Sequence, residues 1–438
     1  MSHGLPGRAG RREPASSVAP VASGYERSLR PWLALAHRTG SARIHSDMSS
    51  ETIPWWLAEE APQPLPRRPL DGPADVEIIG GGVTGCACAL ALAEGGLRVR
   101  LYEARSVAGG ASGRNGGFAL PGGAMRYDVA CESFGGELAR AYWLLTEEYL
   151  DRLEALAGDA LTRPGSLKLA ADEEELEQLR LEHAALRADG FEAEWRRRDA
   201  LPPRLQGGSL GGILHPHDGS LQPARFVLRL AARAVEAGVE ICEGTRVESL
   251  DELSAPRVVI ATDGSGRGLL PELDEVIWPA RGQIVATEPW PERLFEYMNY
   301  ARNGFDYWQQ VPDGRIVLGG FRDFSILAEL TDVEETTPAI QEALDAFLVE
   351  LLGEMPAVAY RWAGIFGLTQ DLLPLVGPIP SRDGVWVAAG YSGHGNVPGF
   401  MCGDLVAQAI LGRPHPLLEL FDPARLIGTA PAASASPV

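Results

Sequence analysis

The sequence predicts an α/β protein with two sheets, in which one domain is split along the chain and encloses a second, α+β domain on an antiparallel or mixed sheet. Two observations predict this fold class. Glycine-rich strand–helix patterns lie near both ends of the chain, at residues 76–103 and 385–411. Between them, short strand patterns and a Pro-Asp-Gly turn at residues 312–314 indicate antiparallel pairing. A chain of 438 residues is long enough for two to three domains.

The most specific pattern is at residues 76–103, where an apolar strand leads into Gly80, Gly82 and Gly85, then a helix and a strand that ends at Glu103. Gly80 suits the tight turn, Gly82 lets the backbone approach a pyrophosphate, and Gly85 lets the helix pack on the strand. The helix N-terminus attracts phosphate. Glu103 follows Gly80 by 23 positions, where a carboxylate can accept from ribose hydroxyls. The pattern predicts a Rossmann-like dinucleotide site; because the chain has 51 glycines, a turn without ligand is the alternative.

Composition narrows the function classes. The formal charge of −20 argues against a nucleic-acid surface, which needs clustered Lys and Arg. No apolar run approaches the ~20 residues of a spanning helix. The five cysteines are too scattered for a disulfide framework or a metal site, so we expect reduced thiols, a cytoplasmic protein and no metal.

The remaining elements follow from periodicity. Residues 1–47 have no periodic apolar pattern and are expected to be disordered, or to precede a start at Met48. Helices are predicted at residues 137–157, 173–188, 338–352 and about 403–411. Strands are predicted at residues 166–170, 239–242, 257–262, 282–287, 315–319 and 385–389.

Four separated motifs resemble one family in order and spacing. They are the glycine turn at residues 80–85, the run Ala-Ser-Gly-Arg-Asn-Gly-Gly at 111–117, the strand at 258–262 and the run Gly-Tyr-Ser-Gly-His-Gly at 390–395. Across roughly residues 48–425 the chain resembles the FAD-dependent amine oxidoreductases of the glycine-oxidase and D-amino-acid-oxidase (DAO) family. The resemblance implies an FAD-binding domain at 48–130, 210–275 and 363–425, a substrate domain at 131–209 and 276–362, and a disordered tail at 426–438.

The resemblance also implies which residues contact FAD. Arg114 would pair with phosphate and Asn115 with polar atoms of flavin or ribose. The N–H groups of residues 390–395 would face the negative charge of reduced flavin. The implied cofactor residues are Gly80, Gly82, Val83, Thr84, Gly85, Glu103, Ala104, Ser112, Arg114, Asn115, Gly116, Val247, Ala261, Thr262, Gly393, His394 and Gly395. Gly364 stands where some relatives carry a flavin-linked Cys, so non-covalent FAD is expected.

One departure from the family concerns the substrate. Glycine-oxidase relatives grip the substrate carboxylate with an Arg, and Phe366 stands at that position. The run around Phe366 looks more like that of gamma-glutamylputrescine oxidases, whose substrate presents a primary amine there. The alternative is that Arg302 or Arg322 supplies the grip.

Four residues are pocket candidates: Tyr307, Trp308, Phe366 and His394. A purely structural role is open for Tyr307, Trp308 and His394, because aromatic residues pack well in sheets and a lone histidine is often structural. No catalytic base is assigned. The strand at 316–319 lacks the Lys that sarcosine-type relatives place near flavin, so either oxygen or a quinone-type acceptor could take the electrons.

The predicted function is oxidation of a small-molecule amine, with hydride transfer to FAD and hydrolysis of the imine to a carbonyl product. A D-amino-acid or glycine-type oxidase or dehydrogenase is the first alternative. A flavin monooxygenase and a flavoprotein without turnover are the others.

Overall fold

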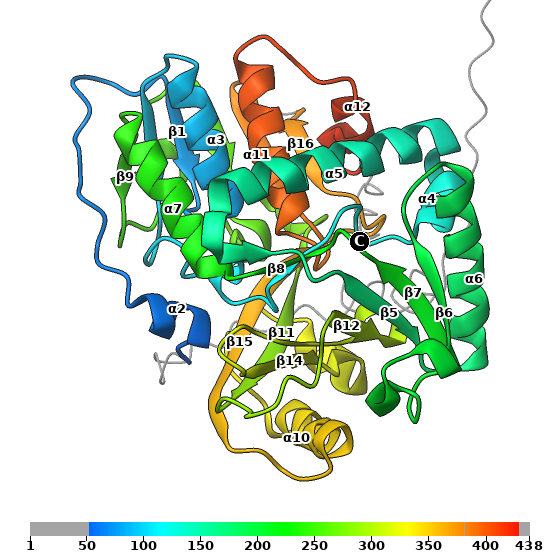
Figure 1. The fold of residues 1–438 in the computed structure, drawn as a ribbon. Coiled ribbons are helices and arrows are strands. Elements are labelled where there is room, and N and C mark those ends of the chain that lie inside the picture. Colours follow the sequence, from blue (N-terminus) through cyan, green and yellow to red (C-terminus); the bar gives the residue numbers. More distant parts are fainter. Residues whose placement is uncertain (1–51, 381, 429–438) are drawn as a thin grey trace, which may run out of the picture.

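The computed structural model describes residues 52–380 and 382–428, so the predicted disordered segment 1–47 lies outside the described residues. Two large sheets form the molecule, joined by a small three-stranded sheet (Figure 1). This arrangement confirms the predicted mixed α/β fold class. The residue ranges of the two domains stay a prediction.

The first sheet has six strands in the order β16-β17-β10-β1-β2-β9, parallel except for the edge strand β16. Its strands come from three separate stretches of the chain. In chain order they are β1 (Val76–Ile79), β2 (Val99–Tyr102), β9 (Glu240–Cys242), β10 (Val258–Ile260), β16 (Leu375–Pro378) and β17 (Val385–Ala389). All four residues of β1 are buried, as expected for a central strand covered on both faces.

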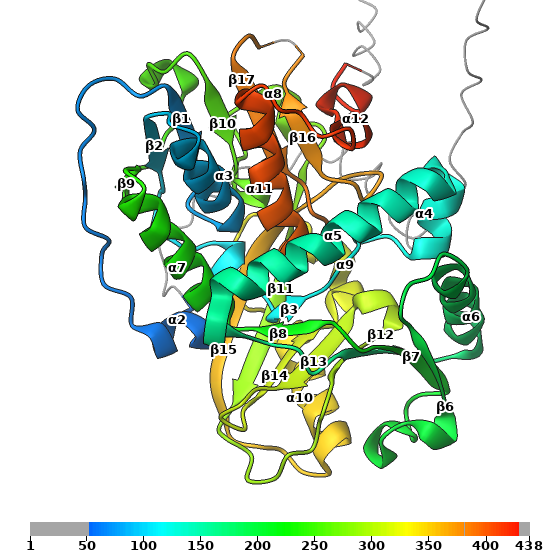
Figure 2. The same cartoon turned by 45° about the horizontal axis from the view of Figure 1, so that its top comes forward.

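Helices α3 (Val83–Glu94), α7 (Pro223–Glu236) and α11 (Val397–Ile410) lie side by side over one face of this sheet, and α5 (Gly136–Ala157) crosses them (Figure 2). Helix α11 was predicted to begin near residue 403, since Gly399 and Gly403 resemble helix breakers. This prediction was wrong, because α11 begins at Val397. The two glycines instead permit close packing: a Cβ on Gly403 would lie 2.3 Å from the carbonyl oxygen of Thr84 in α3.

The second sheet has eight strands in the order β15-β11-β14-β13-β12-β5-β7-β6, antiparallel except between β12 and β5. In chain order they are β5 (Ser166–Ala170), β6 (Glu194–Arg197), β7 (Gly211–His215), β11 (Trp278–Thr287), β12 (Met298–Ala301), β13 (Asp306–Gln310), β14 (Ile316–Gly320) and β15 (Val358–Leu368). Strand β7 thus pairs in this sheet, although the range 210–275 was assigned to the FAD-binding domain. The small sheet joins β3 (Phe118–Ala119), β8 (Gly219–Leu221) and β4 (Leu161–Thr162).

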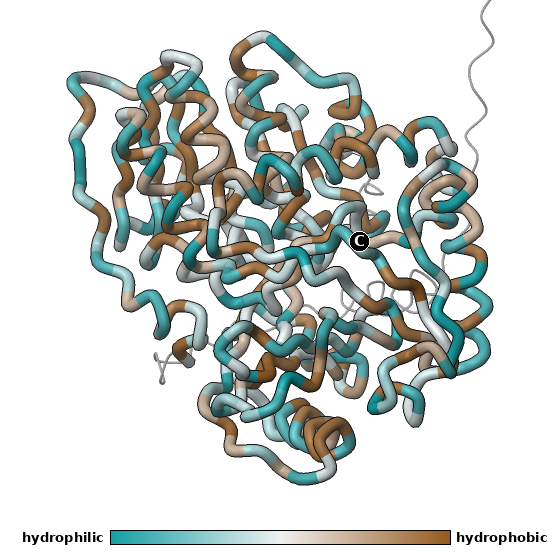
Figure 3. Tube along the Cα trace, viewed as in Figure 1, coloured by the Kyte–Doolittle hydropathy of each residue, from teal (hydrophilic) through white to brown (hydrophobic). Residues whose placement is uncertain are grey.

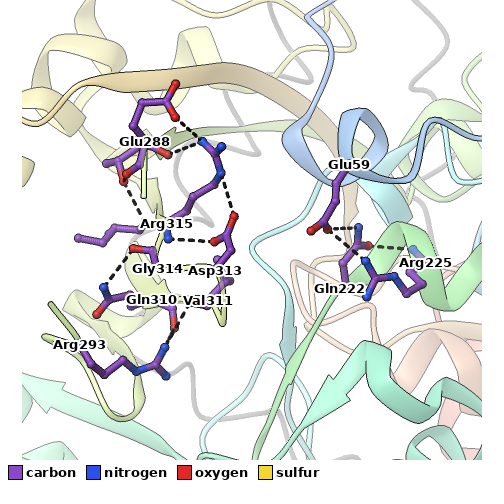
Figure 4. Close-up of polar contacts among 12 residues, drawn as sticks. Glu59, Gln222, Arg225, Glu288, Arg293, Gln310, Val311, Asp313, Gly314 and Arg315 are labelled. Atoms are coloured by element: carbon purple, nitrogen blue, oxygen red, sulfur yellow. Dashed lines mark hydrogen bonds and ion pairs between the residues drawn. The ribbon is translucent and has the colours of Figure 1, made fainter. Parts of the chain in front are cut away.

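Polar contacts fix two surface segments (Figure 4). The predicted Pro-Asp-Gly turn joins β13 to β14, and Arg315 after it contacts the side chains of Asp313 and Glu288 at 3.0 and 3.2 Å. The helix α2 (Trp55–Glu60) is held against α7, where Gln222 donates to Glu59 at 3.0 Å. Both segments are therefore anchored to the sheets and helices that they flank.

Apolar segments of the chain run through the interior of both halves (Figure 3). One core lies under α3, α5, α7 and α11. Another lies between the second sheet and α10 (Pro338–Leu352). Leu426 and Ile427 are buried in a third core, so the predicted tail at 426–438 is wrong for these two residues; residues 429–438 lie outside the described part. No helix among the described residues has the length and apolar character to span a membrane.

Candidate active site

The loops that follow four parallel strands converge on one cavity of about 220 Å³. Gly82 follows β1, Ser112 follows β2, Ala261 follows β10 and Gly393 follows β17, and all four line the cavity. The carboxyl ends of parallel strands meet at one edge of a sheet, where nucleotides bind in such folds. The second sheet forms the opposite wall.

The glycine turn has the geometry that its sequence predicts. Gly80 has a φ of +112°, and a Cβ there would lie 2.4 Å from the carbonyl oxygen of Ala261. A Cβ on Gly85 would lie 1.9 Å from the oxygen of Gly80, so only glycine lets α3 approach the turn. The carboxylate of Glu103 accepts the N–H of Gly81 at 2.7 Å, which fixes its position beside the turn.

Arg114 has a different environment from the one expected. Its guanidinium is 5% exposed and donates to the carbonyl oxygens of Gly109 (2.8 Å) and Ala363 (3.2 Å). It also forms an ion pair with Glu334 at 3.2 Å. Although Arg114 lines the cavity, these partners engage its Nε and Nη1 atoms, and they link the loop after β2 to β15 of the second sheet. In this arrangement phosphate pairing by Arg114 is not supported.

Asn115 links the loop after β2 to the beginning of α11. Its side-chain amide and that of Asn396 donate to each other, with both N···O distances 3.0 Å. The Asn115 amide also donates to the oxygen of Ser112, and its oxygen accepts the N–H of Gly117. Residues far apart in the sequence are thereby locked across the mouth of the cavity.

Asp263 holds together the ends of three strands. It has a φ of +47°, and its carboxylate accepts the N–H groups of Gly367 and Gly390, each at 2.8 Å. Burial raises the pKa of Asp263 above its usual value, opposed by these backbone hydrogen bonds. Two strands thus hold Asp263 in a backbone conformation that is rare outside glycine. Such conformations cluster at functional sites.

Aromatic rings form the opposite wall. The ring of Tyr307 lies across Gly319 and beside Gly116, where a Cβ would come within 2.5 and 2.7 Å of it. Phe366, at the end of β15, lies beside it in the cavity lining. Burial raises the pKa of Tyr307 to about 12, so its phenol keeps its proton at neutral pH. Aromatic rings thus dominate this wall, which also carries the hydroxyls of Tyr307 and Tyr300.

The two arginines proposed as a carboxylate grip differ in position. Arg302 forms ion pairs with Asp306 and Asp323 and does not line the cavity. Arg322 lines the cavity, and its guanidinium carbon lies 5.4 Å from the ring centre of Phe366. Of the two, only Arg322 could meet a substrate in this cavity.

His394 lies where the cavity meets a second one. Burial lowers its pKa to about 4, so the imidazole is neutral near pH 7. Its Nδ1 atom is buried and has no hydrogen-bond partner among the described residues. A neutral ring with an unused nitrogen can donate to or accept from a bound molecule.

Most of the predicted residues come together and several do not. The cavity lining contains Gly82, Val83, Thr84, Ser112, Arg114, Asn115, Gly116, Ala261, Tyr307, Phe366, Gly393, His394 and Gly395. Gly80, Gly85, Glu103, Ala104, Thr262 and Val247 are outside this lining. Trp308 is a core residue: it is 2% exposed and packs on Phe347 of α10, because neighbours in a strand face opposite sides of a sheet.

Sequence reasoning missed several lining residues. Asn396 and Tyr391 flank the glycines of the last loop, and the hydroxyl of Tyr391 lies 2.9 Å from that of Thr84. Tyr300, on β12, lines the cavity from the second sheet. An Asn directly after a glycine-rich run and before Pro398 is a helix-start signal that could have identified Asn396. No local pattern identifies Tyr300, because strand pairing places it there.

This site and fold define a dinucleotide-dependent oxidoreductase with a nucleotide-binding sheet and a substrate sheet. The chain belongs to the FAD dependent oxidoreductase (DAO) family, whose model matches residues 75–409. It is therefore an FAD-dependent enzyme, and the predicted family is confirmed.

Known relatives are similar over most of their length. Gamma-glutamylputrescine oxidoreductase of Escherichia coli is 28% identical over 364 residues, 77% of this chain and 84% of the relative. Glycine oxidase of Geobacillus kaustophilus is 28% identical over 357 residues, 77% of this chain and 92% of the relative. Its crystal structure matches with a TM-score of 0.66, covering 82% of this chain and 99% of that one. L-proline dehydrogenase from P. horikoshii shares the fold, with a TM-score of 0.67 at 22% identity over 81% of this chain and 98% of its own.

Proposed function

We propose that the protein oxidises the C–N bond of a small amine, with hydride transfer from the carbon next to nitrogen to non-covalently bound FAD. The observation that supports this most is the cavity between glycine-rich strand ends and an aromatic wall. Two similar proteins are named for gamma-glutamylputrescine and for glycine, both of which carry a primary amine.

The residues present fit FAD. Lining glycines leave backbone exposed where side chains would intrude, and a Cβ on Gly82 would lie 2.8 Å from the Ser112 hydroxyl. Gly82, Ser112, Asn115, Ala261 and the loop at residues 390–395 would hold the cofactor. Bound FAD supplies an acceptor for two electrons as hydride. No cysteine among the described residues lines the cavity, which supports a non-covalent complex.

The chain's own groups prepare the substrate. The nitrogen must be neutral, because its lone pair assists departure of the hydride. Burial against Tyr307 and Phe366 disfavours the ammonium form. Loss of hydride leaves an iminium ion, and addition of water gives the carbonyl product plus ammonium or a smaller amine. Holding both reactants in contact within the cavity supplies much of the rate.

A second candidate is oxidation of an amino acid, and Arg322 favours it. A guanidinium beside Phe366 can bind a carboxylate through paired N–H donors. In either case we propose oxygen or a quinone-type molecule as the electron acceptor.

An anaerobic amine panel tests the proposal. The purified holoenzyme is mixed with gamma-glutamylputrescine, putrescine, glycine and D-amino acids, and flavin absorbance is followed while carbonyl products are trapped. We expect at least one amine to bleach the flavin with one carbonyl formed per flavin, and acid to release free FAD into the supernatant. Bleaching by NADPH but by no amine would overturn amine oxidation in favour of a monooxygenase. Flavin that stays with acid-precipitated protein would overturn non-covalent binding.

A further inference from the structure

A second cavity of about 110 Å³ adjoins the proposed active site. We call it the side chamber; it lies among β5, β7, α5 and the loop at residues 216–218. It shares lining residues with the first cavity, namely Leu120, Ala124, Tyr300, Asn303, Gly304 and His394. The shared residues form a neck with both apolar and polar side chains, which an extended substrate would cross to reach from one space to the other.

The cations that line the side chamber already have carboxylate partners. Lys168, the one lysine in the sequence, lies 2.7 Å from Glu182, and Arg126 lies 2.9 Å from Asp128. Burial lowers the pKa of His215 to about 4, so this ring is neutral near pH 7. Among the described residues, the cations of this lining are therefore already paired with carboxylates. The side chamber is poorly suited to an anionic group of a ligand.

Asp218 is in the opposite situation. Its side chain is 6% exposed and lines the side chamber, yet it forms no ion pair with any described residue. Within the part of the chain that the structure describes, its carboxylate accepts one side-chain hydrogen bond, from the hydroxyl of Ser166 at 2.5 Å. A buried carboxylate without a counter-charge is unfavourable unless a ligand supplies one. Burial accordingly raises the pKa of Asp218 to about 7.

Glu147 reinforces the negative character of the side chamber. It is half-buried on α5, lines the same space, and has no hydrogen-bond partner among the described residues. Its proximity helps to raise the pKa of Asp218, after the larger effect of burial. Two carboxyl groups that form no ion pair with any described residue thus line one space beside the active site; the charges of His217 and, for Asp218, of Arg163 act on them from beyond ion-pair distance.

We propose that the side chamber binds a second, cationic group of the substrate at Asp218 and Glu147, so that the substrate is a diamine or another amine with a distal ammonium. This inference rests on the proposed amine oxidation. The reacting amine stays neutral beside Tyr307, while the distal ammonium donates to the carboxylates across the neck. Charge-assisted hydrogen bonds of this kind are about twice as strong as neutral ones.

The experiment compares two amines with the same carbon chain. Cadaverine and n-pentylamine differ only by the terminal ammonium, and anaerobic flavin reduction gives a rate constant and an apparent Kd for each. If only carboxylated amines react, lysine and norleucine replace them. The variants are Asp218→Asn, which keeps the Ser166 contact, and Glu147→Gln, which keeps the volume. Glu192→Gln is the control, since Glu192 lines the same space but is exposed and pairs with His217.

In the unmodified enzyme we expect cadaverine to bind at least about tenfold more tightly than n-pentylamine. Asp218→Asn should remove most of that preference by weakening cadaverine alone, with reduction at saturation unchanged, and Glu147→Gln should remove part of it. Glu192→Gln should keep the preference. If both Asp218→Asn and Glu147→Gln kept the full cadaverine preference of the unmodified enzyme, the inference would be overturned while amine oxidation stands. If no amine bleached the flavin, the proposed function would fall and this inference with it.

Discussion

Asn115 and Asn396 form a reciprocal amide pair that joins the second strand end of the parallel sheet to the first turn of α11. Within the pair, each side chain donates one hydrogen bond to the other and accepts one from it. Replacing Asn396 removes both hydrogen bonds of the pair, so the loop at Asn115, which stays bonded to Ser112 and Gly117, loses its link to α11.

Asn396→Ala should therefore weaken cofactor binding. We expect the Kd for FAD to rise about tenfold and the free energy of unfolding to fall by about 1–2 kcal/mol, because one hydrogen-bonded pair is lost at the cavity mouth. Titration of the apoprotein with FAD and thermal melting measure both. Gln408→Ala is the control on the same helix, since the Gln408 side chain hydrogen-bonds Asp404 and lies outside the cavity lining. Equal FAD affinity in the two variants would contradict the role of the pair.

Gly85→Ala should abolish FAD binding or folding. Its Cβ would lie 1.9 Å from a backbone oxygen, so the helix must move away from the turn. A steric conflict with backbone costs on the order of 3–5 kcal/mol. Gly136→Ala, where a Cβ meets nothing within 4 Å, is the matched control and should bind FAD normally. Recovery of yellow, stable Gly85→Ala protein would show that this turn is not needed.

Arg322→Met separates the two candidate functions. If the substrate carries a carboxylate, kcat/KM should fall about 10²-fold or more, because a bidentate ion pair is removed. If the substrate is an amine without one, kcat/KM should change less than about threefold. Steady-state assays with glycine and with n-pentylamine distinguish these outcomes. Arg322→Lys should rescue little, since a lysine cannot provide the planar pair of donors.

Asp218 should make stability depend on pH. Its pKa is near 3.8 unfolded and about 7 folded, so between these values the folded state binds more protons and the free energy of unfolding falls as pH rises. Below about pH 4 both states are protonated, and above about pH 7 the loss is complete. At pH 8 the free energy of unfolding of Asp218→Asn should thus exceed that of the unmodified protein by about 1–3 kcal/mol. At pH 4 the two should be equal. Glu147, His217 and Arg163 are the charged groups that act on Asp218 and are kept unchanged. Equal free energies of unfolding at pH 8 would contradict a buried charge on Asp218.

Local patterns predicted the elements whose signals are short-range. Helices α6 (Glu173–Ala188) and α10 match their predicted bounds, because apolar spacing and a proline or an aspartate at the start define them. The glycine turn followed from three glycines between a strand and a helix. These features depend on residues close in sequence.

Other features depend on tertiary contacts and were not predicted from sequence. Arg114 was assigned to phosphate, but Glu334 lies 220 positions later, and nothing local indicates that ion pair. Tyr307 and Trp308 looked equivalent, and only the orientation of β13 between the cavity and α10 separates them. Asp218 resembles an ordinary turn residue in sequence. Its burial beside the active site arises from the pairing of β5 with β7.

The most direct measurement is the isotope effect on anaerobic flavin reduction by an amine that carries deuterium on the carbon next to nitrogen. Hydride transfer from that carbon predicts reduction slowed several-fold relative to the protiated amine, with one carbonyl product per flavin. Flavin that stays oxidised with every amine, in a folded and FAD-loaded enzyme, would contradict the account.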